Sequence, residues 1–217
     1  MAAKSYKNTQ GKRLPSVTTI ISRFKDSGAL LYWANTQGLE GKTLDEARIP
    51  AANAGTMAHS MVEAHLHKRP LPEFPDTDKE TVGKARNAFE AFLTWERMTK
   101  LKVRHTEVSL ASERHQFGGT LDAIGTVDGR NGLCVVDWKS SAKIYADYLH
   151  QVAAYAILWE ESYPEHPITG GYHICRFAKE EGDFSHHFFD DLEHEKKTFL
   201  MMRQLYDMVK ATEKRVR

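Results

Sequence analysis

The segment from Gly118 to Tyr155, GGTLDAIGTVDGRNGLCVVDWKSSAKIYADYLHQVAAY, decides the fold of this 217-residue chain. Two apolar runs rich in β-branched residues, Leu121–Val127 and Leu133–Trp138, flank the turn sequence Asp128–Gly132. This pattern predicts an antiparallel β-hairpin. The residues that follow, Ala146–Ser162, are predicted to form a helix.

The two predicted strands carry acidic residues that we expect to face each other. With the turn centred near Arg130, Asp122 lies opposite Asp137 or its neighbour, with Cβ atoms roughly 5 Å apart. Lys139 shares the face of Asp137, whereas Trp138 points away. An ordinary surface ion pair would explain Asp137 and Lys139 alone, but not a second carboxylate on an apolar sheet. Because two such close carboxylates are costly unless a cation lies between them, the pattern predicts a divalent-cation site.

Four motifs resemble those of the PD-(D/E)xK nucleases, in particular the RecB-like exonuclease branch. They are GTMAH over Gly55–His59, GGTLD ending at Asp122, Asp137-Trp138-Lys139, and QVAAY over Gln151–Tyr155. The similarity extends from about Leu14 to Tyr172. Its first part, Leu14–Gly41, is similar to the N-terminal segment of small phage and mitochondrial members.

The resemblance implies an α/β fold with a restriction-endonuclease-like core, in which helices flank a central mixed β-sheet on both faces. It also implies roles for individual residues. The catalytic residues would be Asp122, Asp137 and Lys139. The metal ligands would be His59, Asp122, Asp137 and the backbone carbonyl of Trp138. Gln151 and Tyr155 would orient the DNA strand and support the lysine.

Three further residues are weaker candidates. Glu63 follows His59 by one helical turn and could support the site or bind a second metal. Glu107, in the predicted strand Val103–Leu110, is either an acid near the metal or an ordinary solvent-facing residue. Trp33 either stacks on DNA bases or belongs to the core.

The ligand types suit Mg²⁺ or Mn²⁺, as one ion or two, because oxygen donors dominate with a single imidazole nitrogen. A zinc site made of His59, Glu63 and His67 is disfavoured, since the three drift around one helix and lack the HExxH pattern. Several relatives hold an iron–sulfur cluster with four cysteines. This chain has only Cys134 and Cys175, so we expect neither a cluster nor a zinc ribbon.

Composition is that of an ordinary globular protein, with 41% hydrophobic and 27% charged residues. We expect a single nuclease domain over 1–217, with 1–45 as a helical N-terminal extension or cover and 190–217 as a C-terminal helix. Apolar runs are too short to span a membrane and no signal peptide is evident, which predicts a cytoplasmic protein, in the host cytoplasm if phage-encoded. The net charge of +1 means that affinity for nucleic acid has to come from local basic residues and bound metal.

Helical periodicity also predicts helices before the hairpin. They cover Val17–Phe24, Ala29–Thr36 and Leu44–His67, the last of them broken near Ile49-Pro50.

These features favour a metal-dependent DNA exonuclease that hydrolyses phosphodiester bonds from the ends of linear DNA, with single-stranded ends preferred. Its expected setting is phage DNA replication, recombination or degradation. One alternative is a non-catalytic DNA-binding or recombination accessory module with a nuclease fold. The other is a restriction-like endonuclease, for which the chain offers no recognition motif. Polarity, oligomeric state and any recombination partner are left open by the sequence.

Overall fold

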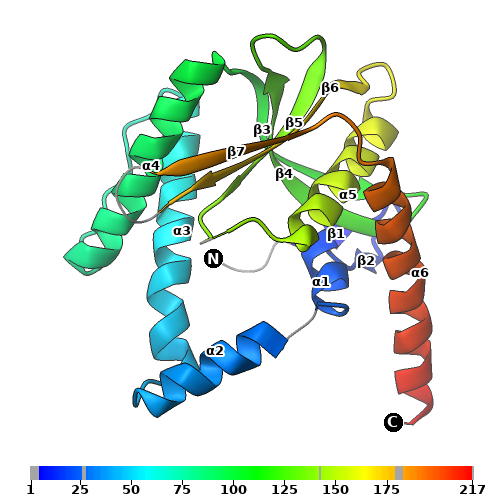
Figure 1. The fold of residues 1–217 in the computed structure, drawn as a ribbon. Helices are drawn as coiled ribbons and strands as arrows, with labels where there is room; N and C mark the ends of the chain where they lie inside the picture. Colours follow the sequence, from blue (N-terminus) through cyan, green and yellow to red (C-terminus); the bar gives the residue numbers. More distant parts are fainter. Residues whose placement is uncertain (1–4, 26–27, 142, 179–182, 217) are drawn as a thin grey trace.

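The computed structural model describes residues 5–25, 28–141, 143–178 and 183–216. Its centre is a five-stranded mixed sheet in the order β3-β4-β5-β6-β7 (Figure 1). The strands are β3 (Lys102–Ser112), β4 (Phe117–Thr126), β5 (Leu133–Lys139), β6 (Ile168–Phe177) and β7 (Phe184–Phe189). Neighbouring strands are antiparallel except β5 and β6, which are parallel and joined through helix α5 (Ala146–Ser162).

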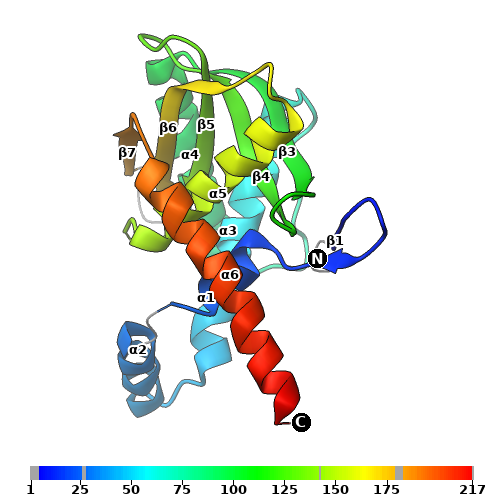
Figure 2. The same ribbon diagram turned by 90° about the vertical axis from the view of Figure 1, so that its right-hand side faces the viewer.

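Helices cover both faces of this sheet, which confirms the predicted restriction-endonuclease-like α/β architecture. One face packs against α3 (Leu44–Leu66) and α4 (Lys79–Thr99) (Figure 1). The other packs against α5, α6 (Glu193–Arg215) and the short α1 (Val17–Ser22) (Figure 2). None of the helices in the described residues is long and apolar enough to cross a membrane.

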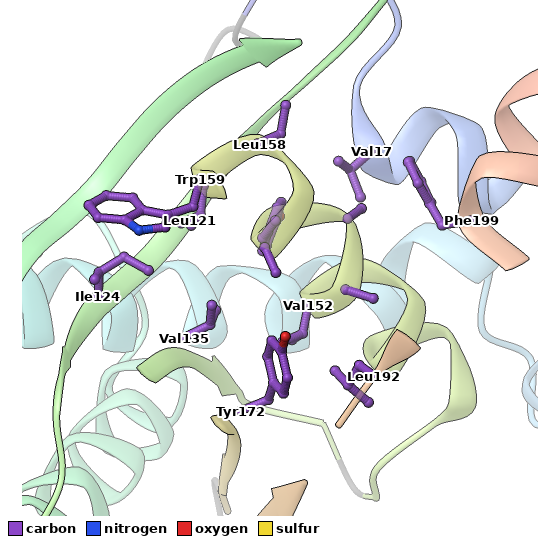
Figure 3. Close-up of a cluster of buried hydrophobic side chains, with 14 of the residues drawn as sticks. Val17, Leu121, Ile124, Val135, Val152, Leu158, Trp159, Tyr172, Leu192 and Phe199 are labelled. Atoms are coloured by element: carbon purple, nitrogen blue, oxygen red, sulfur yellow. The ribbon is translucent and has the colours of Figure 1, made fainter. Parts of the chain in front are cut away.

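Each face of the sheet has its own apolar core. In the core on the α5 side, Leu121, Val135 and Trp159 pack with residues of α1 and α6 (Figure 3). In the core on the α3–α4 side, the Trp138 ring lies 5.4 Å from that of Phe92, edge to face. Trp138 therefore anchors the end of β5 in apolar packing, as expected from strand alternation.

The hairpin of β4 and β5 has the register that the sequence predicts. Ala123 pairs with Val136 and Gly125 with Cys134. One further step along this register would place Asp122 opposite Asp137, but the main-chain pairing ends at Ala123. The two carboxylates therefore lie where the two strands begin to separate.

Helix α3 is continuous, so the prediction of a break near Ile49-Pro50 was wrong. A capping box formed by Thr43 and Glu46 fixes its first turn. Pro50 lies in the second turn, where it removes the hydrogen bond to the Glu46 carbonyl and its ring crowds that oxygen, but the helix continues past it. The continuous helix carries Arg48 and His59 along the same side of the molecule.

The N-terminal region differs from a purely helical extension. Strands β1 (Tyr6–Lys7) and β2 (Arg13–Leu14) form a small hairpin, and the Tyr6 hydroxyl hydrogen-bonds that of Thr120 at 2.8 Å. The Val17, Ile20 and Ile21 side chains of α1 are buried in the core. Helix α2 (Gly28–Leu39), by contrast, lies away from the sheet, near the start of α3 (Figure 1).

Candidate active site

The end of β5 is held to β4 by a side chain. The backbone amide of Trp138 donates a hydrogen bond of 2.9 Å to Oδ2 of Asp122. Because this bond takes the place of the main-chain pairing that ends at Ala123, it fixes the position of the Asp122 carboxylate.

Three side chains from three elements converge beside this carboxylate. One ligand atom each from His59 of α3, Glu107 of β3 and Asp122 of β4 lie within 4.8 Å of one another. Glu107 has a left-handed backbone with φ of 50° inside a strand, a conformation that costs a non-glycine residue about 1–2 kcal/mol. Such strain at a cluster of ligand-type side chains is typical of functional sites.

A close contact between α3 and the end of β5 positions His59. A Cβ atom on Gly55 would lie 2.5 Å from Oγ of Ser140, so a larger residue at this position requires the serine hydroxyl or the helix to shift. His59 follows one helical turn later and its imidazole faces Asp122 and Glu107. The glycine of the GTMAH motif therefore has a packing role, and the histidine supplies the ligand atom.

The DxK motif forms a buried ion pair. Nζ of Lys139 lies 2.5 Å from Oδ2 of Asp137, and the Asp137 side chain is only 1% exposed. Burial raises the pKa of Asp137 to about 6 despite the nearby lysine, and the Asp122 carboxylate adds to this effect. Although burial disfavours the charged ammonium, Asp137 and Asp122 together raise the pKa of Lys139, which is therefore held in its protonated form.

His59 is held in its neutral form. Burial lowers its pKa and the Lys139 ammonium adds to this, while the Asp137 and Glu107 carboxylates oppose both. A neutral imidazole has a lone pair available for a cation. The charge state of His59 thus matches that of a metal ligand.

The QVAAY motif faces the same acids from α5. Nε2 of Gln151 donates a hydrogen bond of 2.7 Å to the Tyr155 hydroxyl. Burial raises the pKa of Tyr155 well above its usual value, and the nearby Asp137 and Asp122 add to the effect. The Tyr155 ring also lies close to β4, where a Cβ atom on Gly119 would meet it at 2.8 Å. Gly119 therefore lets α5 approach the site, whereas Gly118 makes room for the Tyr6 side chain of β1.

Two adjoining hollows open onto these groups. Both are lined by His59, Ala52 and Ser140. The first, of about 580 Å³, is also lined by Glu63 and Glu107. The second, of about 600 Å³, is also lined by Arg48, Asp122, Trp138, Lys139, Ser141, Tyr148 and Gln151. Together they form one cleft with His59 at its middle.

Most of the residues proposed from the sequence meet in or beside this cleft. His59, Asp122, Lys139 and Gln151 line it, with Asp137 and Tyr155 buried next to it. The Asp137 carboxylate contacts Lys139 and does not belong to the group of His59, Glu107 and Asp122. Its direct role as a metal ligand, and that of the Trp138 carbonyl, stay predictions.

The structure places the three weaker candidates at different distances from the cluster of ligand atoms. Glu107 joins the ligand cluster. Glu63 lines the first hollow but forms an ion pair of 2.7 Å with Arg69. Trp33 is half-buried on α2 and is not among the residues that line either hollow.

Four residues of the cleft were missed by the sequence reasoning: Arg48, Ser140, Ser141 and Tyr148. Ser140 and Ser141 directly follow the DxK motif, so their position was a usable signal. Arg48 precedes His59 by eleven residues, three helical turns, and that spacing shows only if the helix is taken as unbroken at Pro50.

The donor set fits a divalent cation. His59, Glu107 and Asp122 supply one nitrogen and carboxylate oxygens, a combination suited to Mg²⁺ or Mn²⁺. Apart from the Lys139 ammonium, neither oxygen of Asp137 has a hydrogen-bond donor among the described residues. A buried carboxylate in this state has unused capacity to accept a cation or a water molecule. The two cysteines are buried in the sheet, Cys134 on β5 and Cys175 on β6.

Residues 18–215 match the family model of the PD-(D/E)XK nuclease superfamily. Among solved structures, a protein from Eubacterium rectale that is provisionally named an exonuclease is similar with a TM-score of 0.49 and 12% identity. The match covers 70% of this chain and 64% of that one.

A second solved structure, LHK-Exo in complex with dAMP, is similar with a TM-score of 0.36 and 11% identity, over 85% of this chain and 93% of that one. No curated protein sequence matches the chain. The family match spans nearly the whole sequence and includes all of the residues that meet at the cleft. The chain therefore belongs to the PD-(D/E)XK nuclease superfamily.

Proposed function

We propose that this protein is a metal-dependent DNA exonuclease that removes nucleotides from the ends of linear DNA, with single-stranded ends preferred. The observation that carries the proposal is the junction of two groups in one cleft. The ligand atoms of His59, Glu107 and Asp122 lie within 4.8 Å of one another, and the buried Asp137–Lys139 pair adjoins them. Phosphodiester hydrolysis requires this combination of cation ligands and a fixed positive charge.

The cation is Mg²⁺ or Mn²⁺, held by Asp122, His59 and Glu107, with Asp137 and the Trp138 carbonyl as further proposed ligands. When bound, such a cation supplies Lewis-acid stabilisation of the phosphoryl oxygens and increases the acidity of water at the site. One or two ions are compatible with this donor set.

Lys139 contributes a fixed ammonium. Because Asp137 and Asp122 raise its pKa, the side chain donates hydrogen bonds and stabilises negative charge on the reacting phosphate. Asp137 holds the ammonium in place through the 2.5 Å contact. Gln151 lines the cleft and is fixed by its hydrogen bond to Tyr155, so that its amide is positioned to orient the DNA strand.

Action at DNA ends is supported by the N-terminal part of the chain. Helix α2 lies beside the start of α3 and exposes the apolar side chains of Leu30, Leu31 and Tyr32 (Figure 1). We propose that residues 1–45, including Trp33, form a cover through which an end has to pass. A role in phage replication, recombination or degradation, with a recombination partner and a cytoplasmic location, completes the proposal.

A cleavage assay tests this function. End-labelled single-stranded, duplex and closed circular DNA are incubated with Mg²⁺ or Mn²⁺ and with the wild type, Lys139→Ala or Lys100→Ala. Lys100 is an exposed lysine paired to Asp128 and serves as the matched control. We expect loss of linear DNA only, a decrease of about 10²-fold or more with Lys139→Ala, and no change with Lys100→Ala.

Three other outcomes of the cleavage assay would contradict this proposal. Cleavage of circles would replace the exonuclease with an endonuclease. Near-wild-type activity of Lys139→Ala would contradict the proposed role of the lysine. Binding of DNA without any metal-dependent cleavage would favour the non-catalytic module.

A further inference from the structure

The two halves of the cleft differ in charge. The hollow on one side of His59 contains two acids, Glu63 and Glu107. The hollow on the other side contains two cations, Arg48 and Lys139, and one acid, Asp122, together with polar and aromatic side chains. A DNA strand carries one negative charge per nucleotide, so its phosphates are attracted to the second hollow and repelled from the first.

A series of aromatic and cationic side chains continues outward from the second hollow. Nζ of Lys139 lies 4.9 Å from the centre of the Tyr148 ring, which in turn meets the Tyr145 ring edge to face at 5.6 Å. Nζ atoms of Lys25 and Lys143 lie 5.5 and 5.4 Å from the centre of the Tyr145 ring. We call these four outer residues, Lys25, Lys143, Tyr145 and Tyr148, the Tyr145 surface.

Tyr148 packs partly against the core on the α5 side, but core packing does not explain Lys25, Lys143 and Tyr145. Tyr145 is 38% exposed and is the N-cap residue of α5, yet its side chain makes no capping hydrogen bond. Lys25 is partly neutralised by an ion pair of 3.1 Å with Asp147. Lys143 is exposed and has no ion pair with a carboxylate within the part of the chain that the structure describes.

We propose that the Tyr145 surface binds a segment of single-stranded DNA next to the catalytic cleft. A base stacks on the exposed Tyr145 ring, and the flanking phosphates contact Lys143 on one side and Arg48 on the other. Interleaved aromatic and basic side chains bind single strands without sequence preference, because every base has a face that can stack. The inference rests on the proposed function only in taking the cleft as the site where the strand ends.

Equilibrium binding separates stacking from charge. A fluorescent dT 12-mer and an abasic 12-mer are titrated in EDTA, so that no cleavage occurs, at several salt concentrations. The variants are Tyr145→Leu and Lys143→Ala. The matched controls are Tyr206→Leu and Lys210→Ala on α6, where the lysine Nζ lies 5.3 Å from the tyrosine ring centre in a similar cation–π pair.

The two variants have different expected signatures. Tyr145→Leu weakens binding of the dT 12-mer about fivefold or more, because fivefold corresponds to the weakest stacking measured for one base on an aromatic ring. The affinity of Tyr145→Leu for the abasic 12-mer equals that of the wild type. Lys143→Ala weakens both oligonucleotides and lowers the slope of log affinity against log salt by about 0.7, as expected for one lost phosphate contact on a single strand. The α6 controls bind like the wild type.

Oligonucleotide binding tests the Tyr145 surface, and DNA cleavage tests the nuclease activity. Wild-type affinity in both Tyr145→Leu and Lys143→Ala would overturn the inference, as would a wild-type protein that binds neither oligonucleotide. Cleavage of linear DNA by the wild type with Mg²⁺ or Mn²⁺ is measured separately. Loss of binding in the two variants without any such cleavage would uphold the Tyr145 surface and reject the nuclease.

Discussion

The backbone amide of Trp138 is hydrogen-bonded to the Asp122 carboxylate at 2.9 Å, so a side chain joins β4 to β5 at the point where their main-chain pairing has ended. The Trp138 ring is buried between α4 and the sheet, so the amide that orients Asp122 is itself held by the core. Packing on one face of the sheet thus sets the position of a carboxylate at its edge.

Asp122→Asn tests this arrangement, because it keeps an oxygen that can accept the Trp138 bond but removes the charge. Thermal unfolding is measured in EDTA and in increasing Mn²⁺ or Mg²⁺, with Glu165→Gln as an exposed control. We expect metal to stabilise the wild type against thermal unfolding. In Asp122→Asn the affinity for metal should fall by more than the roughly 10–100-fold that is typical when a residue hydrogen-bonded to a metal ligand is lost. The substitution removes both the repulsion with Asp137 and the attraction to Lys139, so the effect of metal on each protein is measured relative to its own stability in EDTA. Metal stabilisation equal to that of the wild type would exclude Asp122 as a ligand.

Gly55 is predicted to be required for the approach of α3 to Ser140. Glycine inside a helix costs about 0.5–1 kcal/mol relative to alanine, so Gly83→Ala on α4, where the added Cβ meets nothing within 4 Å, should stabilise the protein by that amount. Gly55→Ala should not stabilise it and should reduce cleavage, because the Cβ would lie 2.5 Å from Oγ of Ser140.

The double variant Gly55→Ala/Ser140→Ala identifies the cause. Removing the hydroxyl relieves the contact, so in urea unfolding the double variant should be more stable than the sum of the two single effects predicts. Additive effects on stability would mean that the Gly55–Ser140 contact does not limit the position of α3.

The hairpin of β4 and β5 could be predicted because its determinants are local. The turn at Asp128–Gly132 fixes the register, and the register fixes which side chains share a face. Burial of Trp138 opposite Lys139 follows from the alternation of a strand. The four motifs predict that His59, Gln151 and the acids share one site, and each motif has a geometric counterpart at the cleft.

What could not be predicted depends on the backbone or on contacts distant in sequence. The pairing of Thr106 with Ala123 and of Val108 with Leu121 brings Glu107 next to Asp122, and neither this register nor the left-handed backbone of Glu107 could be predicted from strand alternation. The β1–β2 hairpin is held to β4 by Tyr6 and Thr120, which are 114 residues apart. Its turn did carry a signal, since Asn8 and Gly11 are turn-forming residues and Gly11 has a φ of 77°.

The strained backbone of Glu107 predicts that Glu107→Gly is more stable than Glu107→Ala, the reverse of the order at an ordinary strand position. In an ordinary strand glycine is less stable than alanine, as we expect when Ser109→Gly is compared with Ser109→Ala. At position 107, where φ is 50°, glycine should instead be more stable than alanine by about 1 kcal/mol, because only glycine adopts this backbone without a steric cost. Urea unfolding of the four variants measures both differences. Both variants at position 107 lose the carboxylate, so both should bind Mn²⁺ more weakly. An alanine variant as stable as glycine would show that the backbone relaxes at no cost.

A buried histidine pair on β6 and β7 predicts how stability depends on pH. Nδ1 of His173 lies 2.7 Å from Nε2 of His186, and the His173 side chain is 1% exposed. Burial lowers the pKa of His173 to about 4, and the neighbouring His186 and Arg130 add to the effect. Between the usual pKa of 6.5 and about 4, the unfolded chain binds a proton that the folded chain does not. The free energy of unfolding should therefore fall as the pH decreases through this range, by about 3 kcal/mol in total from this group.

His173→Phe, which keeps a ring but cannot titrate, isolates that contribution. Urea unfolding is measured from pH 7.5 to pH 4 for the wild type, His173→Phe and the exposed control His194→Gln. The variant is expected to lose less stability than the wild type on acidification, whatever its stability at pH 7.5, and the control should follow the wild type. Since His186 is also shifted downward by burial, some acid sensitivity should remain in His173→Phe. Parallel curves for the wild type and His173→Phe would mean that His173 is protonated equally in the folded and unfolded chains.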